Sequence, residues 1–323
     1  MTKLLLYIPG NLSKGGIREL KEFFKKIAKK NYELTVFSQG KYISIFDDDT
    51  KHILASSFRV VNEIRLKNYS SSFDNIICFS NLPSLFKLNC SQFVLIQNRY
   101  LIEKKLPNNL GFIFFFKMLI QRLFLRYFMR DSSFIVQTLT MVFYLKRFGI
   151  DDEKILLINY ELLNNPINFS DSEKETTFFY PTSLDPHKNI QCLISAWNIL
   201  SLSNIKARLE ITITEDYLYK LNKDYANLNI TPTGFLSEED VSSKIKNCDY
   251  LIYPSLIESY GYNLKDAEVL AKNIISSESS YVYDVCQPIN TFDPSCEFSI
   301  ARSVARTLGS EEVFLRNYFK GIK

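Results

Sequence analysis

Histidine is scarce in this chain of 323 residues, in which only His52 and His187 occur. A zinc site built from several histidines is therefore excluded. The six cysteines include no Cys-x-x-Cys pair, and we see no signal peptide before them. We therefore expect reduced thiols and a cytoplasmic protein. The apolar runs are also too short for a transmembrane helix, because none reaches the roughly 18 residues that such a helix needs.

The composition is that of a globular protein, with 46% hydrophobic and 23% charged residues, and the length favours two domains. The net charge of +4 hides an asymmetry. Residues 1–165 hold 24 Lys and Arg against 14 Asp and Glu, whereas residues 166–323 hold 15 against 21. The basic half suggests contact with a polyanion, either nucleic acid or an anionic membrane surface. Ordinary variation in surface charge is the alternative.

The first half begins with a strand, a glycine-containing loop, a helix and a second strand. The apolar run 3–8 stops at Pro9-Gly10, residues 17–30 have helical periodicity, and 33–38 is again apolar. Such a βαβ unit predicts a parallel sheet covered on both faces. Further strands are predicted at 75–79, 92–97, 133–137 and 154–160.

The polar segment 164–175 predicts a domain boundary. After it the alternation of strands and helices restarts. We expect an α/β protein with two Rossmann-like doubly wound domains facing across a cleft. The domains would be 1–165 and 166–308, with a tail at 309–323 that is helical and packs back towards the N-terminal domain. Strands are predicted at 177–181, 208–214, 249–254 and 273–276, and helices at 190–200, 238–246, 264–271 and 297–308.

The stretch 110–130 combines aromatic and cationic residues. Arg122, Arg126 and Arg130 recur at a spacing of four, and bulky apolar residues gather on the opposite side. This pattern suits a helix lying in the interface of an anionic bilayer. A core helix with a solvated arginine edge is the alternative.

The segment 249–268 carries the most informative motif. An apolar strand ends at Pro254-Ser255, and a helix begins near Leu264 with Asn263 as its expected N-cap. The free backbone N–H groups of such a helix start bind phosphates. Glu258 on the loop and Asp266 in the first helical turn could hydrogen-bond the hydroxyls of a sugar.

Residues 254–261, Pro-Ser-Leu-Ile-Glu-Ser-Tyr-Gly, resemble the signature P-S-x-x-E-x-F/Y-G of the family 4 retaining glycosyltransferases of GT-B architecture, of the type found in bacterial surface polysaccharide assembly. The resemblance implies that Glu258 contacts the donor sugar and that Asp266, in place of the usual Glu, contacts the ribose. Alternatively, Asn263-x-x-Asp266 is a capping box. The amides facing the sugar diphosphate would be those of Tyr260, Gly261, Tyr262 and Asn263.

The segment 178–200 resembles the phosphate loop of this family, whose lysine contacts the donor diphosphate. Lys188 matches that lysine, and Ser183 stands where the family has an arginine. His187 could supply part of the missing positive charge or be an ordinary loop residue. Thr233-Gly234-Phe235-Leu236, followed by acidic residues, resembles the segment near the nucleotide base, so Gly234 and Phe235 are donor-binding candidates.

The resemblance is looser in the first half. Gly15-Gly16 fits the glycine-rich loop that approaches the donor phosphates, and a simple helix-starting turn is the alternative. Gln97 occupies the place where many relatives have a histidine beside the reacting sugar. The run Asp47-Asp48-Asp49 could hold a divalent metal in other glycosyltransferases, but its polar surroundings favour a solvated turn.

These motifs together predict a retaining, metal-independent glycosyltransferase that needs no cofactor, with Lys188 and Glu258 as its catalytic residues. Its donor would be a nucleotide diphosphate sugar and its acceptor a glycan, lipid-linked, at the inner face of the cytoplasmic membrane. The anionic membrane would be contacted through 110–130, and no nucleic acid would be bound. The alternatives are a nucleotide-sugar-binding or scaffold subunit with impaired catalysis, and an epimerase of the same fold.

Overall fold

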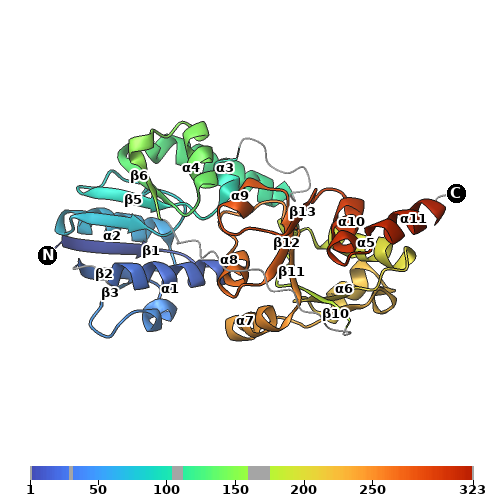
Figure 1. Cartoon of the computed structure of the whole chain (residues 1–323). Coiled ribbons are helices and arrows are strands. Elements are labelled where there is room, and N and C mark those ends of the chain that lie inside the picture. Colours follow the sequence, from blue (N-terminus) through green and yellow to red (C-terminus); the bar gives the residue numbers. More distant parts are fainter. Residues whose placement is uncertain (1, 29–31, 104–111, 159–174, 322–323) are drawn as a thin grey trace. The chain divides into compact units, whose positions relative to one another are not determined.

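The computed structural model describes residues 2–28, 32–103, 112–158 and 175–321 (Figure 1). The chain divides into two compact units, residues 1–159 and 160–323. The expected boundary segment 164–175 lies outside the described residues except for its last position. Each unit is built on one parallel sheet, as the repeated βαβ pattern predicts.

The first unit contains a seven-stranded sheet in which every paired strand is parallel. The strand order reverses direction between β1 and β4, which makes this the switch point of the sheet. In spatial order the strands are β3 (Lys51–Leu54), β2 (Tyr32–Ser38), β1 (Thr2–Ile8), β4 (Asn75–Cys78), β5 (Ser91–Leu95), β6 (Ser132–Val136) and β7 (Ile155–Leu157).

Helices cover both faces of this sheet. Leu4, Leu6 and Ile8 of β1 pack against the apolar stripe of α1 (Lys14–Ala28). Tyr7 points to the other face, where its hydroxyl donates to Glu63 of α2 (Arg59–Tyr69). This alternation along β1 produces the doubly wound arrangement. The remaining α-helices described in this unit are α3 (Phe112–Phe128) and α4 (Leu139–Phe148).

The second unit contains a six-stranded parallel sheet with its switch point between β8 and β11. Its strands in spatial order are β10 (Ile230–Pro232), β9 (Arg208–Ile211), β8 (Thr177–Tyr180), β11 (Tyr250–Tyr253), β12 (Asn273–Ser277) and β13 (Asn290–Phe292). Its helices are α5 (Ile190–Leu202), α6 (Glu215–Leu221), α7 (Glu238–Asn247), α8 (Tyr262–Val269), α9 (Ser280–Tyr283), α10 (Glu297–Thr307) and α11 (Glu311–Gly321).

The C-terminal tail is helical, but it packs on its own unit. Phe314 of α11 is fully buried in the core of the second unit, and the Nδ2 atom of Asn317 donates to the carbonyl of Ser203, 2.9 Å away. Helix α11 packs against α5 and α10 of this unit.

Candidate functional site

The switch point of the second sheet brings Lys188 and Glu258 together. Lys188 lies on the loop after β8, and Glu258 lies on the loop after the neighbouring strand β11. The Nζ atom of Lys188 is 2.5 Å from the Oε1 atom of Glu258, and the two side chains are 16% and 12% exposed. Ligands of doubly wound proteins bind at this edge of the sheet, so the pair stands where such a ligand would be bound.

Two buried tyrosines hold this pair in place. The Tyr253 hydroxyl donates to the Oε1 atom of Glu258 at 3.0 Å, and its ring centroid lies 5.7 Å from the Lys188 Nζ. The Tyr180 hydroxyl donates to the Lys188 carbonyl at 2.7 Å. Both tyrosines are the last residues of their strands. The sequence analysis did not identify them, although aromatic residues that end buried strands beside a motif are a usable signal.

The ion pair keeps both groups charged. Burial opposes the ammonium form of Lys188, but the Glu258 carboxylate outweighs burial and raises the pKa of the lysine. Burial likewise favours the neutral form of Glu258, and Lys188 outweighs it, so the pKa of the carboxyl is lowered. Burial lowers the pKa of His187, which is therefore mainly neutral at pH 7 and adds little positive charge to the loop.

The two loops are also joined through their backbones. The Leu256 N–H donates to the His187 carbonyl at 2.8 Å, and the Asn189 Nδ2 donates to the Pro254 carbonyl at 3.1 Å. Asn189 has a φ of +60° where the loop enters α5, a conformation that asparagine tolerates. These bonds fix the position of Lys188 relative to Glu258 before any ligand arrives.

Helix α8 begins two residues earlier than its motif suggested. Gly261 is the N-cap, with a φ of +84°. Asn263 lies inside the helix, and its Nδ2 atom donates to the Pro181 carbonyl at 3.2 Å. The predicted Asn263 N-cap and the capping box with Asp266 were therefore wrong, because the left-handed turn at Gly261 starts the helix first. Asn263 instead ties α8 to the loop after β8.

The other candidates around this motif lie on α8 or just before it. Tyr260 is buried, and its ring packs edge-on against Tyr262 at 4.9 Å between centroids. Asp266 is partly buried within α8. The N–H groups of Leu264 and Lys265 bond to the Gly261 carbonyl, which leaves the first amides of α8 without a partner inside the helix.

Ser183 and the segment at Gly234 lie on loops at the same edge of the sheet. The Ser183 hydroxyl donates to Asp185 Oδ2 at 2.6 Å, so a serine–aspartate pair stands where the resemblance placed an arginine. Gly234 follows β10 with a φ of +71°, and Phe235 beside it is 55% exposed. Because all these strands are parallel, the loops that follow β8, β10 and β11 emerge on one side.

In the first unit, Gly15 and Gly16 lie in the first turn of α1, directly after the loop that follows β1. Ser13 caps this turn, since its Oγ accepts from the Gly16 N–H at 3.1 Å. A Cβ at Gly16 would approach Leu12 at 3.3 Å, whereas a Cβ at Gly15 would meet no atom closer than 4.0 Å. Gly16 is thus required by packing, and Gly15 leaves its backbone accessible.

Gln97 lies just beyond the carboxyl end of β5 and is joined to two residues that the sequence analysis missed. Asn81, which has a φ of +63°, accepts the Gln97 N–H at 2.5 Å. Glu19 of α1 lies close to the Gln97 side chain and is only 4% exposed. Burial raises the pKa of Glu19 to about 8. Its position in register with Phe23 and Ile27 on the apolar stripe of α1 was a signal in the sequence.

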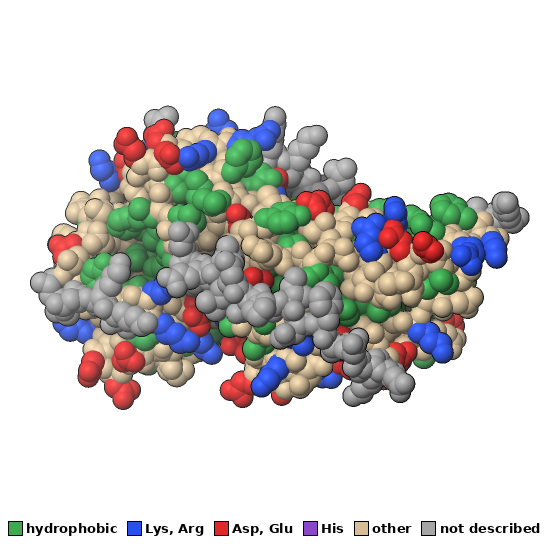
Figure 2. Space-filling view, viewed as in Figure 1, with side chains coloured by type: hydrophobic (Ala, Val, Ile, Leu, Met, Phe, Trp, Pro, Cys, Tyr) green, Lys and Arg blue, Asp and Glu red, His purple; other side chains and the backbone are tan. Residues whose placement is uncertain are grey.

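The aromatic helix α3 presents apolar side chains to solvent. Met118 and Leu125 are buried, whereas Ile120, Leu123 and Tyr127 are 64%, 61% and 77% exposed. The helix therefore packs on the first unit through Met118 and Leu125 and leaves these other apolar side chains at the surface. Figure 2 shows hydrophobic side chains gathered on the first unit. Over the residues that the structure describes, no helix is both long and apolar enough to cross a bilayer.

Two further features concern metals and thiols. Asp47-Asp48-Asp49 forms an exposed turn, as expected. Within the described parts of the chain, no group of three or more potential ligands is placed to hold a metal ion. All six cysteines are free.

Comparison with known proteins identifies the fold. Residues 165–305 match the family model for group 1 glycosyl transferases. Three similar solved structures are sucrose-phosphate synthase from Thermosynechococcus elongatus, the lipopolysaccharide glycosyltransferase WaaG, and Anabaena HepE in complex with UDP and glucose. Their identities to this chain are 12%, 13% and 12%, with TM-scores of 0.68, 0.64 and 0.67. Each alignment covers 98% of this chain and 93%, 94% and 93% of the respective relative.

A sequence comparison with curated proteins finds no match. The predicted fold class is nevertheless confirmed by the two parallel sheets and by the similar structures. The chain has the two-domain α/β fold of the GT-B glycosyltransferases, and its match to the group 1 glycosyl transferases lies within the second unit.

Proposed function

We propose that this protein is a retaining, metal-independent glycosyltransferase. It transfers a sugar from a nucleotide diphosphate sugar to a hydroxyl group of a lipid-linked glycan in bacterial surface polysaccharide synthesis. The observation that carries the proposal is the Lys188–Glu258 pair, held at the switch point beside the start of α8. The match to group 1 glycosyl transferases covers this same region.

Lys188 supplies positive charge to the departing diphosphate. An ammonium group has three N–H donors, and the bond to Glu258 uses one of them. The remaining donors can bind phosphate oxygens while the ion pair keeps the ammonium group fixed and charged. Charge stabilisation by a group that is already in position needs little reorganisation during the reaction.

Glu258 and α8 complete the donor site. The carboxylate of Glu258 can accept a hydrogen bond from a hydroxyl of the donor sugar. The first amides of α8 bind the diphosphate, and Asp266 binds the ribose. Gly234 and Phe235 lie near the base, and Tyr260, Tyr262 and Asn263 shape the loop around the phosphates.

The proton of the attacking hydroxyl goes to the donor itself. In the family that the motifs resemble, a phosphate oxygen of the donor takes this proton on the face where the sugar leaves, so no enzymic base is required. Gln97 in place of the usual histidine agrees with this route, because an amide can hydrogen-bond but cannot accept a proton near neutral pH. Gly15 and Gly16 contribute backbone contacts from the first unit.

The acceptor reaches the enzyme at a membrane. The exposed apolar side chains of α3, together with the basic first half, suit an anionic membrane surface at the inner face of the cytoplasmic membrane. A nucleic-acid partner would explain the basic half, but it would leave the Lys188–Glu258 site without a role.

A second candidate function is a nucleotide-sugar-binding or scaffold subunit with impaired catalysis. The Ser183–Asp185 hydrogen bond favours it, because a neutral hydroxyl and a carboxylate replace a cation close to the diphosphate. An epimerase of the same fold would instead release free sugar without an acceptor.

The test has two stages. A thermal-shift screen with UDP-, GDP-, ADP- and dTDP-sugars identifies the donor, since a ligand that binds only the native state raises the melting temperature. Transfer is then measured with membrane extract as the source of acceptor, with and without EDTA, and the anomeric configuration of the product is determined. Transfer with retention in EDTA supports the proposal. Binding without turnover supports the scaffold subunit, and free sugar without an acceptor supports the epimerase.

A further inference from the structure

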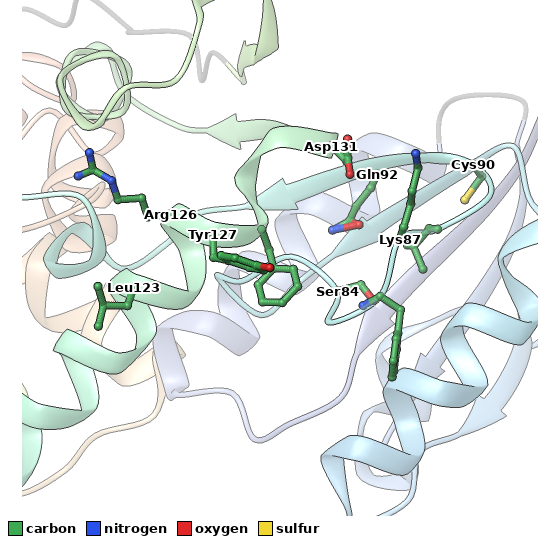
Figure 3. Close-up of a pocket in the computed structure, with 11 residues that line it drawn as sticks. Ser84, Lys87, Cys90, Gln92, Leu123, Arg126, Tyr127 and Asp131 are labelled. Atoms are coloured by element: carbon green, nitrogen blue, oxygen red, sulfur yellow. The ribbon is translucent and has the colours of Figure 1, made fainter.

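A pocket of about 820 Å³ lies in the first unit beside the C-terminal half of α3 (Figure 3). Leu123, Arg126 and Tyr127 of α3 line one side of it, and residues of the β4–β5 connection line the other. Figure 3 shows the side-chain amide of Gln92 in the middle of the drawn residues, between Tyr127 and Lys87. Nothing in the glycosyltransferase site described above uses this pocket.

The pocket lies at the opposite edge of the sheet from Gln97 and the glycine-rich turn. Gln92 is the second residue of β5, and Asp131 directly precedes β6, so both stand at the amino ends of their strands. Gln97 follows the carboxyl end of the same strand β5. Gln97 follows Gln92 by five positions, and an extended chain spans about 16 Å over that length. A ligand in the pocket is therefore distinct from the donor and the acceptor hydroxyl.

A buried polar atom at the pocket points to a ligand. Gln92 is only 7% exposed, and its Nε2 atom has no hydrogen-bond partner among the described residues. A buried donor without a partner destabilises a fold, because it has lost its hydrogen bonds to water and gained none in their place. An acceptor oxygen placed in the pocket would satisfy the amide.

The charged residues that line the pocket favour an anionic ligand. Lys87 and Arg126 stand on opposite sides of it, and Asp131 is the acidic residue in its lining. Throughout the described ranges, neither cation forms an ion pair with a carboxylate. The pocket is lined by two exposed cations and one carboxylate, which favours an anionic ligand. If the ligand also carries a hydroxyl group, that group can donate a hydrogen bond to Asp131.

The apolar side chains beside the pocket favour an amphiphilic ligand. Leu123 and Tyr127 line the pocket and also belong to the exposed apolar face of α3, which continues to Ile120. A small inorganic anion would make no use of this apolar surface. A phospholipid would place its phosphate at the polar end of the pocket and its acyl chains along α3.

We propose that this pocket binds the head group of an anionic phospholipid with a hydroxylated head, of the phosphatidylglycerol type. The phosphodiester accepts hydrogen bonds from Gln92 and Lys87, and Asp131 accepts one from a head-group hydroxyl. Arg126 faces the phosphates of neighbouring lipids. This inference rests on the membrane association proposed above and is independent of sugar transfer.

Short-chain phosphatidylglycerol, kept below its micelle concentration, is titrated calorimetrically into the full chain. Gln92→Leu retains every charge and removes the side-chain amide with its buried donor, so we expect binding to weaken about tenfold. The double variant Lys87→Gln/Arg126→Gln should weaken it more. Lys21→Gln/Arg147→Gln removes two exposed cations elsewhere in the same unit and should leave calorimetric binding unchanged.

Three outcomes overturn the proposal. Unchanged binding in both Gln92→Leu and Lys87→Gln/Arg126→Gln means that the lipid does not enter the pocket. Equal loss in Lys21→Gln/Arg147→Gln means general surface attraction. Inorganic phosphate that binds as tightly as the short-chain lipid means a phosphate site. The donor-induced thermal shift is measured on the same variants, and it should persist in all of them, so failure of the lipid site is separable from failure of the proposed transfer activity.

Discussion

The side chains of Lys188 and Glu258 form a buried ion pair although 70 positions separate them in the sequence. Two adjacent parallel strands, β8 and β11, deliver the loops that carry them. The sequence motifs assigned the two residues separately to a diphosphate and a sugar. The structure joins them, and several predictions depend on this joint arrangement.

Replacing Lys188 should reduce stability as well as activity. Lys188→Met leaves the Glu258 carboxylate buried without its partner, so we expect a loss of about 3 kcal/mol in the free energy of unfolding. Adding Glu258→Gln removes the orphaned charge and keeps an acceptor for Tyr253, so it should restore most of the loss. Urea denaturation of the single and double variants checks this. A double variant no more stable than Lys188→Met would contradict the role of the pair.

The same pair fixes the sign of a pH dependence. The pKa of Glu258 is lowered from 4.5, so its stabilising contribution is present above pH 4.5 and is lost as the pH falls through the lower folded value. The pKa of Lys188 is raised from 10.5, so its contribution is lost only as the pH rises above that value. The stability difference between the native chain and Glu258→Gln should therefore shrink below about pH 4.5.

Glu19 should make the first unit less stable at alkaline pH. Its pKa is raised from 4.5 to about 8, so the folded state binds the proton more tightly than the unfolded state. Stability then falls as the pH rises from 4.5 to 8, by up to about 5 kcal/mol. Glu19→Gln should flatten this dependence and stabilise the protein at pH 8.5. Urea denaturation of both chains at pH 6 and pH 8.5 measures this pH dependence. An equal change in the free energy of unfolding for the native chain and for Glu19→Gln would refute the raised pKa of Glu19.

Gly261 should be needed for its conformation and for space. Gly261→Ala forces alanine to a φ of +84° and places its Cβ 3.2 Å from a terminal methyl of Leu264, so the Leu264 side chain must give way at the first turn of α8. We expect a loss of about 2 kcal/mol and weaker donor binding. Gly309→Ala is the matched control, with a φ of +66° and no atom within 4 Å of the added Cβ. It should lose about 1 kcal/mol in stability and bind the donor normally. Equal donor affinity in both variants would show that α8 does not position the ligand.

The exposed face of α3 should matter for membranes and not for folding. Ile120→Ser/Leu123→Ser changes two side chains that are already 64% and 61% exposed, so stability should hardly change. Binding to anionic vesicles should weaken about a hundredfold, at roughly 1.5 kcal/mol for each side chain. By contrast, Leu125→Ala at a fully buried position should reduce stability by about 2–5 kcal/mol. Vesicle flotation and urea denaturation separate the two effects, and unchanged flotation of the serine variant would exclude this face as a membrane contact.

The sequence predicted the central strands and the edge strand β7, and it missed the other three edge strands. The strands β1, β4, β8 and β11 are buried on both faces, so each reads as a continuous apolar run. The edge strands β3, β10 and β13 have three or four residues and mixed burial, so their pattern is too short to detect. These edge strands are positioned by parallel pairing with strands that are distant in the sequence, and the local sequence carries no signal of that pairing.

The candidate site was predictable where a motif is local and not where it depends on packing. Lys188, Glu258 and Gly261 were identified from short motifs. Tyr253 and Glu19 were missed because their roles depend on contacts with residues on other elements. The capping role of Asn263 was wrong because local propensity favours asparagine at an N-cap, whereas the left-handed turn at Gly261 starts the helix two positions earlier.

The most direct test of the proposed function is sugar transfer by variants that are matched in stability. With the donor from the thermal-shift screen and membrane extract as acceptor, turnover is compared between the native chain and Lys188→Met/Glu258→Gln, at a temperature where both are folded. Loss of the ammonium group from the departing diphosphate should lower turnover by about a hundredfold or more. Native turnover in this folded double variant would contradict the claim that the Lys188–Glu258 pair is the catalytic centre.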